Sequence, residues 1–106
     1  MRYDSLQSYL LSIYQSQVTL LAIRTVHSHI TFGHSESQVN LMMENALSAA
    51  GLKNIWTLVF FGENAALPHG SGTDKILTEG DFVLIDAGGT LNGYNSDVTR
   101  VNDFYD

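Results

Sequence analysis

A β-hairpin is predicted by the Asn92-Gly93 pair, which stands between two apolar runs. Asn and Gly both tolerate a positive φ, and together they favour a two-residue type I′ turn between antiparallel strands. Counting outward from this turn pairs Leu91 with Tyr94. The sequence therefore predicts two neighbouring strands in a defined register.

The same register brings two aspartates to one face of the hairpin. Asp86 is expected opposite Thr99, and Asp97 opposite Gly88. The two aspartates are then diagonal neighbours, with Cα atoms roughly 7–8 Å apart. Carboxylates at this spacing can hold two divalent ions about 3.5–4 Å apart, and hard oxygen ligands suit manganese, magnesium or cobalt.

Two helices are predicted before the strands. Residues 18–30 show apolar steps of three and four, and Ser35 with Gln38 forms a capping box that opens a second helix. Gly51 is placed to end that helix in the left-handed conformation. The expected inward faces are Val18, Leu21, Ala22, Thr25, Val26, His29 and Ile30 for the first helix, and Val39, Met42, Met43, Ala46, Leu47 and Ala50 for the second.

Residues that favour β structure predict three strands, over 55–61, 82–86 and 94–101. The first run is continuously apolar, and we expect it to be buried. Together with the helices, these strands predict an α+β fold in which two helices pack on one face of an antiparallel sheet. We divide the chain into an N-terminal extension over residues 1–17, expected to be helical, and a domain over residues 18–106.

Composition excludes several function classes. The net charge is −6, and the five Lys and Arg residues are scattered, which argues against nucleic acid or an anionic membrane as a partner. The absence of cysteine excludes disulfides and thiolate metal sites. The N-terminal segment has neither the continuous apolar core of a signal peptide nor a span of ~20 apolar residues. By default we expect a cytoplasmic protein.

Three segments resemble the pita-bread metallopeptidases in content, order and spacing: FGENAALPHG, LTEGDFVLIDAGG and GYNSDVTR. The resemblance is to the branch of Xaa-Pro aminopeptidases and dipeptidases, and it extends from Val18 to about Val101. It implies half of a pita-bread fold and hydrolysis of N-terminal peptide bonds. The implied substrate is a peptide with proline at its second position.

The resemblance also implies roles for individual residues. Asp86 corresponds to a bidentate ligand of one metal ion, and Asp97 to a ligand that bridges two ions. His69 corresponds to a residue that binds substrate and stabilises the tetrahedral intermediate, while Asn64 and Ala65 border the substrate pocket. The implied cofactor is a pair of divalent ions, with manganese favoured and cobalt or zinc as alternatives.

The implied metal site is incomplete in this sequence. The family's other three ligands, one His and two Glu, come from the second half of its catalytic domain, and only VNDFYD follows Arg100. We therefore expect residues 18–106 to be the N-terminal half of that domain, truncated and inactive alone, with weak metal binding or none. A half-domain would expose an apolar seam, so we expect poor solubility, or association with itself or with a missing half through that seam. Whether the chain is itself an enzyme stays open.

Other interpretations of the same residues remain. The chain is alternatively a non-catalytic pita-bread module that binds peptides or proteins, a methionine aminopeptidase, or a short α+β interaction domain. The simpler roles are a turn former for Asp86, a hydrogen-bonded strand residue for Asp97 and a solvated loop residue for His69. Thr99 and Arg100 are expected to support Asp97 through hydrogen bonds and charge.

Overall fold

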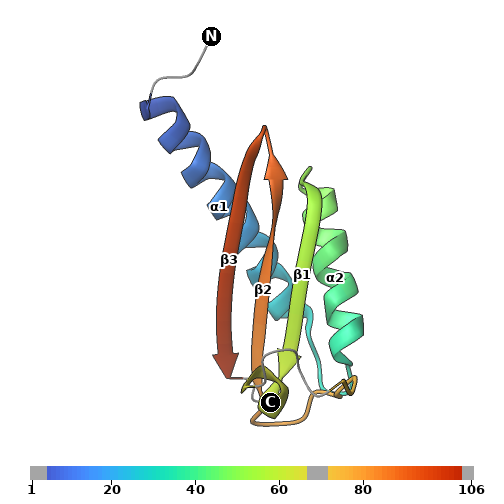
Figure 1. Ribbon diagram of the computed structural model, residues 1–106. Coiled ribbons are helices and arrows are strands. Elements are labelled where there is room, and N and C mark those ends of the chain that lie inside the picture. The colour runs from blue at the N-terminus through green and yellow to red at the C-terminus, as the bar shows by residue number, and fades with distance from the viewer. Residues whose placement is uncertain (1–4, 67–71, 104–106) are drawn as a thin grey trace.

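The computed structural model describes residues 5–66 and 72–103, which form an α+β structure. Its helices are α1 (Ser5–His29) and α2 (Glu36–Ala49), and its strands are β1 (Lys53–Phe61), β2 (Phe82–Leu91) and β3 (Tyr94–Asp103). A short 3₁₀ helix, η1 (Gly62–Ala66), follows β1. The strands form an antiparallel sheet in the order β1-β2-β3, and both helices cover one face of it (Figure 1). The predicted fold class is confirmed.

The β2–β3 hairpin forms as its turn residues predict. The φ angle is 53° at Asn92 and 82° at Gly93, as a type I′ turn requires. Leu91 pairs with Tyr94, and the ladder continues without a break along both strands. β2 therefore extends to the turn, so Asp86 lies within a strand, and the prediction that it ends one was wrong.

The helix α1 runs without interruption from residue 5 to residue 29, and its buried face differs from the predicted one. Leu21, Thr25 and His29 are exposed, whereas Gln15 and Thr19 are only 1% and 0% exposed. The prediction from apolar periodicity was wrong because the buried face of α1 includes two polar residues, Gln15 and Thr19.

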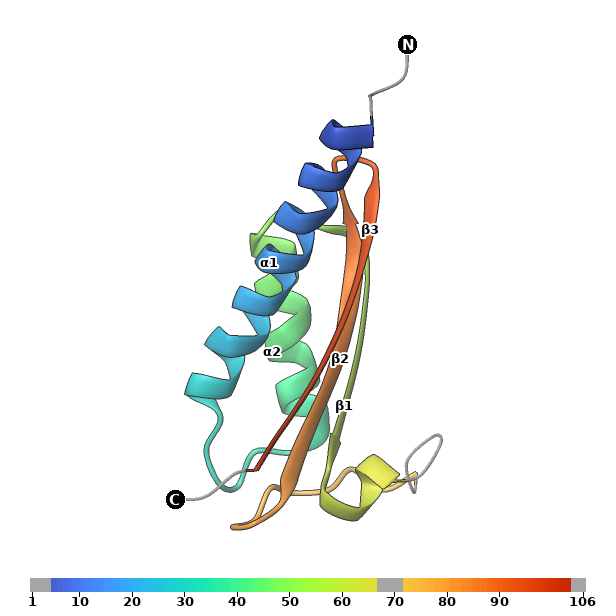
Figure 2. The ribbon, with the colours of Figure 1, turned by 90° about the vertical axis from the view of Figure 1, so that its left-hand side faces the viewer.

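These polar residues face the sheet because the hairpin offers them hydrogen-bond partners. The Gln15 Nε2 atom donates to the carbonyl oxygens of Tyr94 and, at 3.2 Å, of Gly89. The hydroxyls of Thr19 and Ser96 are 2.9 Å apart and share a hydrogen bond. Buried polar groups are tolerated where they are paired in this way. Figure 2 shows α1 running along the sheet on the side of α2, with its N-terminal end near the hairpin turn.

The helix α2 begins and ends where the sequence indicates. The Ser35 hydroxyl accepts a 3.1 Å hydrogen bond from the Gln38 amide, and the Gln38 side chain accepts one of 2.8 Å from the Ser35 amide. This is the predicted capping box. Gly51 follows the helix with a φ of 94°, so the predicted left-handed terminator is confirmed. Ala50, expected on the inward face, is exposed because it caps the end of the helix.

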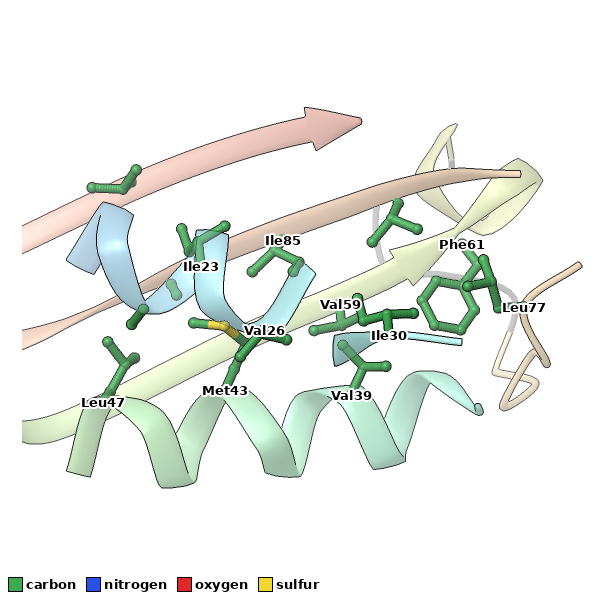
Figure 3. Close-up of a cluster of buried hydrophobic side chains, with 14 of the residues drawn as sticks. Ile23, Val26, Ile30, Val39, Met43, Leu47, Val59, Phe61, Leu77 and Ile85 are labelled. Carbon is green, nitrogen blue, oxygen red and sulfur yellow. The ribbon is translucent and has the colours of Figure 1, made fainter. Parts of the chain in front are cut away.

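The hydrophobic core lies between the two helices and the sheet face that they cover (Figure 3). It includes Ile23, Val26, Val39, Met43, Leu47, Val59, Phe61 and Ile85. Burial alternates along β1, and Trp56 and Leu58 are 39% and 47% exposed. The expectation of a fully buried first strand was therefore wrong, because both helices lie on the same face of the sheet.

The opposite sheet face is called the open face below. Strand register and burial place on it Trp56, Leu58 and Phe60 of β1, Leu84, Asp86 and Gly88 of β2, and Asp97, Thr99 and Val101 of β3. Within residues 5–66 and 72–103, no helix has the length and hydrophobicity needed to cross a membrane.

Candidate metal centre

Asp86 and Asp97 lie on the open face, on the neighbouring strands β2 and β3. Asp86 pairs with Thr99, and Asp97 pairs with Gly88, which confirms the register counted from the turn. Side chains two positions apart on a strand point to the same side, so both carboxylates emerge on one face as diagonal neighbours. Asp86 is half-buried and Asp97 is exposed.

The two carboxyl groups influence each other. Burial raises the pKa of Asp86, and both a hydrogen bond to Asp97 and the negative charge of Asp97 raise it further. A hydrogen bond from Thr99 acts in the opposite direction but does not cancel these effects. The net pKa of Asp86 therefore lies above its ordinary value, as expected for two acids that converge. A divalent cation between them would relieve this repulsion.

Thr99 supports Asp86 rather than Asp97. Its Oγ1 atom donates a 2.8 Å hydrogen bond to Oδ1 of Asp86, directly across the ladder. Arg100 donates from Nη1 to the carbonyl oxygen of Thr99 at 2.8 Å. The prediction that both residues support Asp97 was wrong, because cross-strand pairing directs Thr99 to Asp86 and the alternation of a strand directs Arg100 to the other face.

A shallow hollow opens beside Asp97 on the open face. A Cβ atom on Gly88 would lie 2.9 Å from Cζ2 of Trp56 and 2.0 Å from the Ser96 carbonyl oxygen. Only glycine therefore permits this close approach of the indole and β3 to β2. The hollow is lined by Asn54, Trp56, Gly89, Thr90, Asn95, Ser96 and Asp97.

His69, the third predicted site residue, lies outside the described residues. The segments on either side of it are described, and the buried carboxylate of Glu36 contacts both. It accepts hydrogen bonds from the Phe61 amide at 2.7 Å and from the Lys75 amide at 3.0 Å. Asn64 is buried and donates to Glu36 at 3.1 Å, and its expected place beside a substrate pocket stays a prediction.

Glu36 is a buried carboxylate that no sequence pattern predicts. Its one available signal is its place directly after the N-cap Ser35, where a carboxylate is favoured by the positive end of the helix dipole. That signal does not predict burial, because it would be the same for an exposed residue.

The described residues can supply only part of the coordination sphere of a divalent metal ion. Asp86 and Asp97 are hard oxygen donors of the kind such ions prefer. No three His, Cys, Asp or Glu side chains come together as a metal site within residues 5–66 and 72–103. The two carboxylates are therefore suitable metal ligands, but they are too few to complete a metal site.

Residues 15–104 match the sequence profile of metallopeptidase family M24. The chain belongs to this family. It is 37% identical over 81 residues to an Xaa-Pro dipeptidase of Pyrococcus furiosus, covering 74% of this chain and 23% of the relative. An uncharacterized peptidase of Schizosaccharomyces pombe is 40% identical over 83 residues, covering 77% of this chain and 18% of the relative.

Solved structures of an Xaa-Pro dipeptidase and an X-Pro aminopeptidase share the fold of this chain. An Xaa-Pro dipeptidase from Bacillus anthracis superimposes with a TM-score of 0.83 at 30% identity, covering 100% of this chain and 30% of that one. An X-Pro aminopeptidase from Thermotoga maritima gives a TM-score of 0.80 at 28% identity, covering 92% and 28%. The architecture is thus part of the pita-bread fold.

The M24 chain corresponds to a minor part of these relatives. It spans 18% and 23% of the two curated relatives and 30% and 28% of the two solved chains. The family is metal-dependent by its description.

Proposed function

We propose that this chain supplies one side of the metal site of an Xaa-Pro-type metalloaminopeptidase that hydrolyses N-terminal peptide bonds with two metal ions. The observation that carries the proposal is the convergence of Asp86 and Asp97 on the open face. The likeness to proteins named Xaa-Pro dipeptidase supports a peptide substrate with proline at its second position.

In this proposal Asp86 and Asp97 hold the metal ions. A bound metal pair would polarise the scissile carbonyl and lower the pKa of a water molecule towards neutrality. Thr99 orients Asp86 by donating to Oδ1, and each carboxylate oxygen of Asp86 keeps a lone pair with which it would bind a metal ion. His69 would donate a hydrogen bond to the oxygen on which negative charge develops. Manganese is the favoured ion, with cobalt and zinc as alternatives.

We further propose that the chain alone binds metal weakly and does not turn over substrate. Two carboxylates leave most of the coordination sphere of an ion to water, and affinity grows with the number of protein ligands. A cytoplasmic location and self-association through an exposed seam stay predictions from the sequence.

A second candidate is a non-catalytic pita-bread module that binds peptides or proteins. It is favoured by the apolar side chains that surround the carboxylates on the open face, where Leu58 and Val101 are 47% and 53% exposed. Exposed apolar groups in one patch are typical of binding surfaces. Peptide binding without metal, and without hydrolysis when metal is added, would favour this candidate.

Calorimetry with manganese, combined with an assay of an Xaa-Pro tripeptide in the same sample, tests the proposal. Weak binding that is lost in Asp97→Ala but kept in Glu79→Gln supports the metal assignment. Glu79 is the matched control because it is an exposed carboxylate outside the open face. Equal affinity in wild type and Asp97→Ala would overturn the ligand assignment, and turnover by the chain alone would overturn its proposed inactivity.

A further inference from the structure

The N-terminal half of α1 carries large apolar side chains that this chain leaves uncovered. Each of them is between 36% and 64% exposed, and they belong to Leu6, Tyr9, Leu10, Ile13 and Tyr14. We call these five residues the outer stripe of α1. Contiguous apolar groups on a surface are typical of a site where another molecule binds.

The spacing of the outer stripe is that of a helix-packing surface. Leu6, Leu10 and Ile13 follow one another at steps of four and three, and the exposed Gln17 continues the series four residues later. Two helices pack side by side along such a repeat. At about 100° per residue these positions lie opposite Gln15, which hydrogen-bonds to the sheet. The helix therefore has two faces suited to packing, and the sheet occupies one of them.

The first turns of α1 lie past the edge of the sheet. Figure 1 shows them extending beyond the edge strand β3. Ser8, on the sheet side, shares a 3.3 Å hydrogen bond with the hydroxyl of Tyr94. A helix in water is stabilised mainly by the packing of its apolar face rather than by its own hydrogen bonds. A partner that covers the outer stripe would therefore stabilise these turns.

Charge indicates which partner fits this surface. Residues 5–23 contain no Asp, Glu, Lys, Arg or His, although the net charge of the chain is −6. Two copies that met at the open face would bring Asp86 and Asp97 towards their counterparts, whereas the outer stripe lets two acidic chains meet without such repulsion. A lipid surface is a poorer match, because helices that lie on membranes carry basic residues on their polar face.

A hollow of about 240 Å³ opens between α1 and β3, beside the outer stripe. Its lining includes Ile13, Ser16, Gln17 and Leu20 of α1 and Val98 and Arg100 of β3. Tyr9 lies seven positions before Ser16, so both lie on the same edge of the stripe. When a two-fold axis relates two antiparallel helices, identical edges meet. The surface thus supplies both a protruding aromatic ring and a recess that can receive it.

We propose that the outer stripe of α1 binds a second copy of this chain, as an antiparallel helix pair related by a two-fold axis. Leu10 packs opposite the partner's Ile13, and Leu6 opposite the partner's Gln17. Tyr9 of each copy enters the hollow of the other. This surface is separate from the open face, so the inference does not depend on the proposed metal site.

Sedimentation velocity of the 106-residue chain and three variants tests the proposal. We expect a wild-type dimer with a dissociation constant in the micromolar range, and Leu10→Glu should raise that constant at least about a hundredfold. Leu41→Glu, on α2, and Leu58→Glu, on the open face, are matched controls because these leucines are 57% and 47% exposed. Both controls should stay within about threefold of wild type.

Three results would overturn the proposal: a wild-type chain that stays monomeric up to about 0.1 mM, a Leu10→Glu variant that still dimerises, or a dimer that only Leu58→Glu disrupts. The last result would assign association to the open face. Circular dichroism shows whether Leu10→Glu folds. If it does not, Tyr9→Ala removes a largely exposed ring and should raise the dissociation constant about tenfold; no change there would equally overturn the proposal.

Disulfide trapping tests the antiparallel arrangement. The chain contains no cysteine, so introduced thiols react only with each other. Leu6→Cys and Gln17→Cys chains, mixed and mildly oxidised, should form the mixed disulfide in preference to either homodisulfide. In the proposed pair, position 6 of one helix lies roughly 16 Å along the axis from position 6 of the other, beyond the reach of a disulfide. A dominant Leu6→Cys homodisulfide, or a random distribution of products, would overturn the arrangement.

Discussion

Thr99 and Asp86 face each other across the β2–β3 ladder, and Thr99 Oγ1 donates a 2.8 Å hydrogen bond to Oδ1 of Asp86. Burial and the neighbouring Asp97 both raise the pKa of Asp86, whereas this hydrogen bond lowers it. The threonine thus favours the ionised form of a carboxylate whose surroundings favour the protonated form. In the proposed metal site a ligand must be ionised, so the threonine would also prepare Asp86 for a cation.

Thr99→Val should raise the pKa of Asp86 further and weaken manganese binding about tenfold, the effect typical of losing a hydrogen bond to a metal ligand. Valine keeps the shape and strand preference of threonine but cannot donate. An NMR titration of the Asp86 carboxyl measures the first effect and calorimetry the second. Thr90→Val is the control, because it removes a 2.9 Å hydrogen bond to Asn95 nearer the turn. Equal effects of the two variants on Asp86 would contradict this assignment.

Asp97→Asn should raise the melting temperature of the metal-free chain at neutral pH by a few degrees, because it removes a negative charge that opposes ionisation of Asp86. The same variant should lose any stabilisation that manganese gives to the wild type, since a ligand stabilises only the state that binds it. Thermal unfolding with and without manganese measures both effects. If manganese still raises the melting temperature of Asp97→Asn, the ions bind elsewhere.

Local sequence features predict the parts of the fold whose partners are close along the chain. Asn92 and Gly93 determine the hairpin register, and with it the meeting of Asp86 and Asp97, because a two-residue turn leaves little freedom to the strands that it joins. Ser35 and Gln38 specify the start of α2 for a similar reason. In both cases the residues that form the structure are close in sequence to the turn or the capping box.

The orientation of α1 and the burial of Glu36 could not be predicted, because both depend on hydrogen-bond partners that are distant in sequence. The orientation of α1 depends on Gln15 reaching the backbone at Gly89, and the burial of Glu36 depends on amides at Phe61 and Lys75. No periodic pattern contains this information, because a polar residue counts as solvent-facing until its partner is known.

Asp81 provides a test by pH. Its carboxylate accepts hydrogen bonds of 3.0 Å from the amide and the hydroxyl of Thr78 and forms a 3.0 Å ion pair with Lys75. Burial raises the pKa of Asp81, but these contacts outweigh it, so the pKa lies below its ordinary value of 3.8.

The stabilisation from Asp81 is therefore present above the ordinary carboxyl pKa and lost as the pH falls through the lower pKa of the folded state. We expect Asp81→Asn to lower the melting temperature by about 5 °C at neutral pH and to have little effect in strong acid. Circular dichroism melts at the two pH values provide the comparison. If Asp81→Asn lowers the melting temperature by the same amount at both pH values, the effect comes from packing rather than from charge.

Gly88→Ala should disrupt the hairpin beside the carboxylates. The added Cβ atom would lie 2.0 Å from the Ser96 carbonyl oxygen, which is backbone and cannot move without separating the strands. We expect a loss of about 3 kcal/mol or more in the free energy of unfolding. Gly93→Ala, where no atom lies within 4 Å, should cost about 1 kcal/mol through its positive φ alone. Urea unfolding measures the free energy of unfolding of both variants. Similar losses in Gly88→Ala and Gly93→Ala would contradict the steric explanation.

Thr19 and Ser96 offer a test of why α1 turns a polar face to the sheet. Their buried hydroxyls are 2.9 Å apart, and Thr19 also donates to the Gln15 carbonyl oxygen at 3.1 Å. With the Thr19 hydrogen directed to Gln15, Ser96 is the donor to Thr19. Thr19→Val then leaves the Ser96 hydroxyl buried without its acceptor, which should cost about 1–2 kcal/mol.

The double variant Thr19→Val, Ser96→Ala should be less destabilised than the sum of the two single variants. Once both hydroxyls are gone, no Ser96 hydroxyl is left buried without an acceptor, so the penalty that Thr19→Val creates alone disappears. A coupling free energy of at least about 0.5 kcal/mol, measured by urea unfolding of all four proteins, is the expected result. Additive losses would mean that the hydroxyl pair does not orient α1, and that its apolar neighbours alone determine which face of the helix is buried.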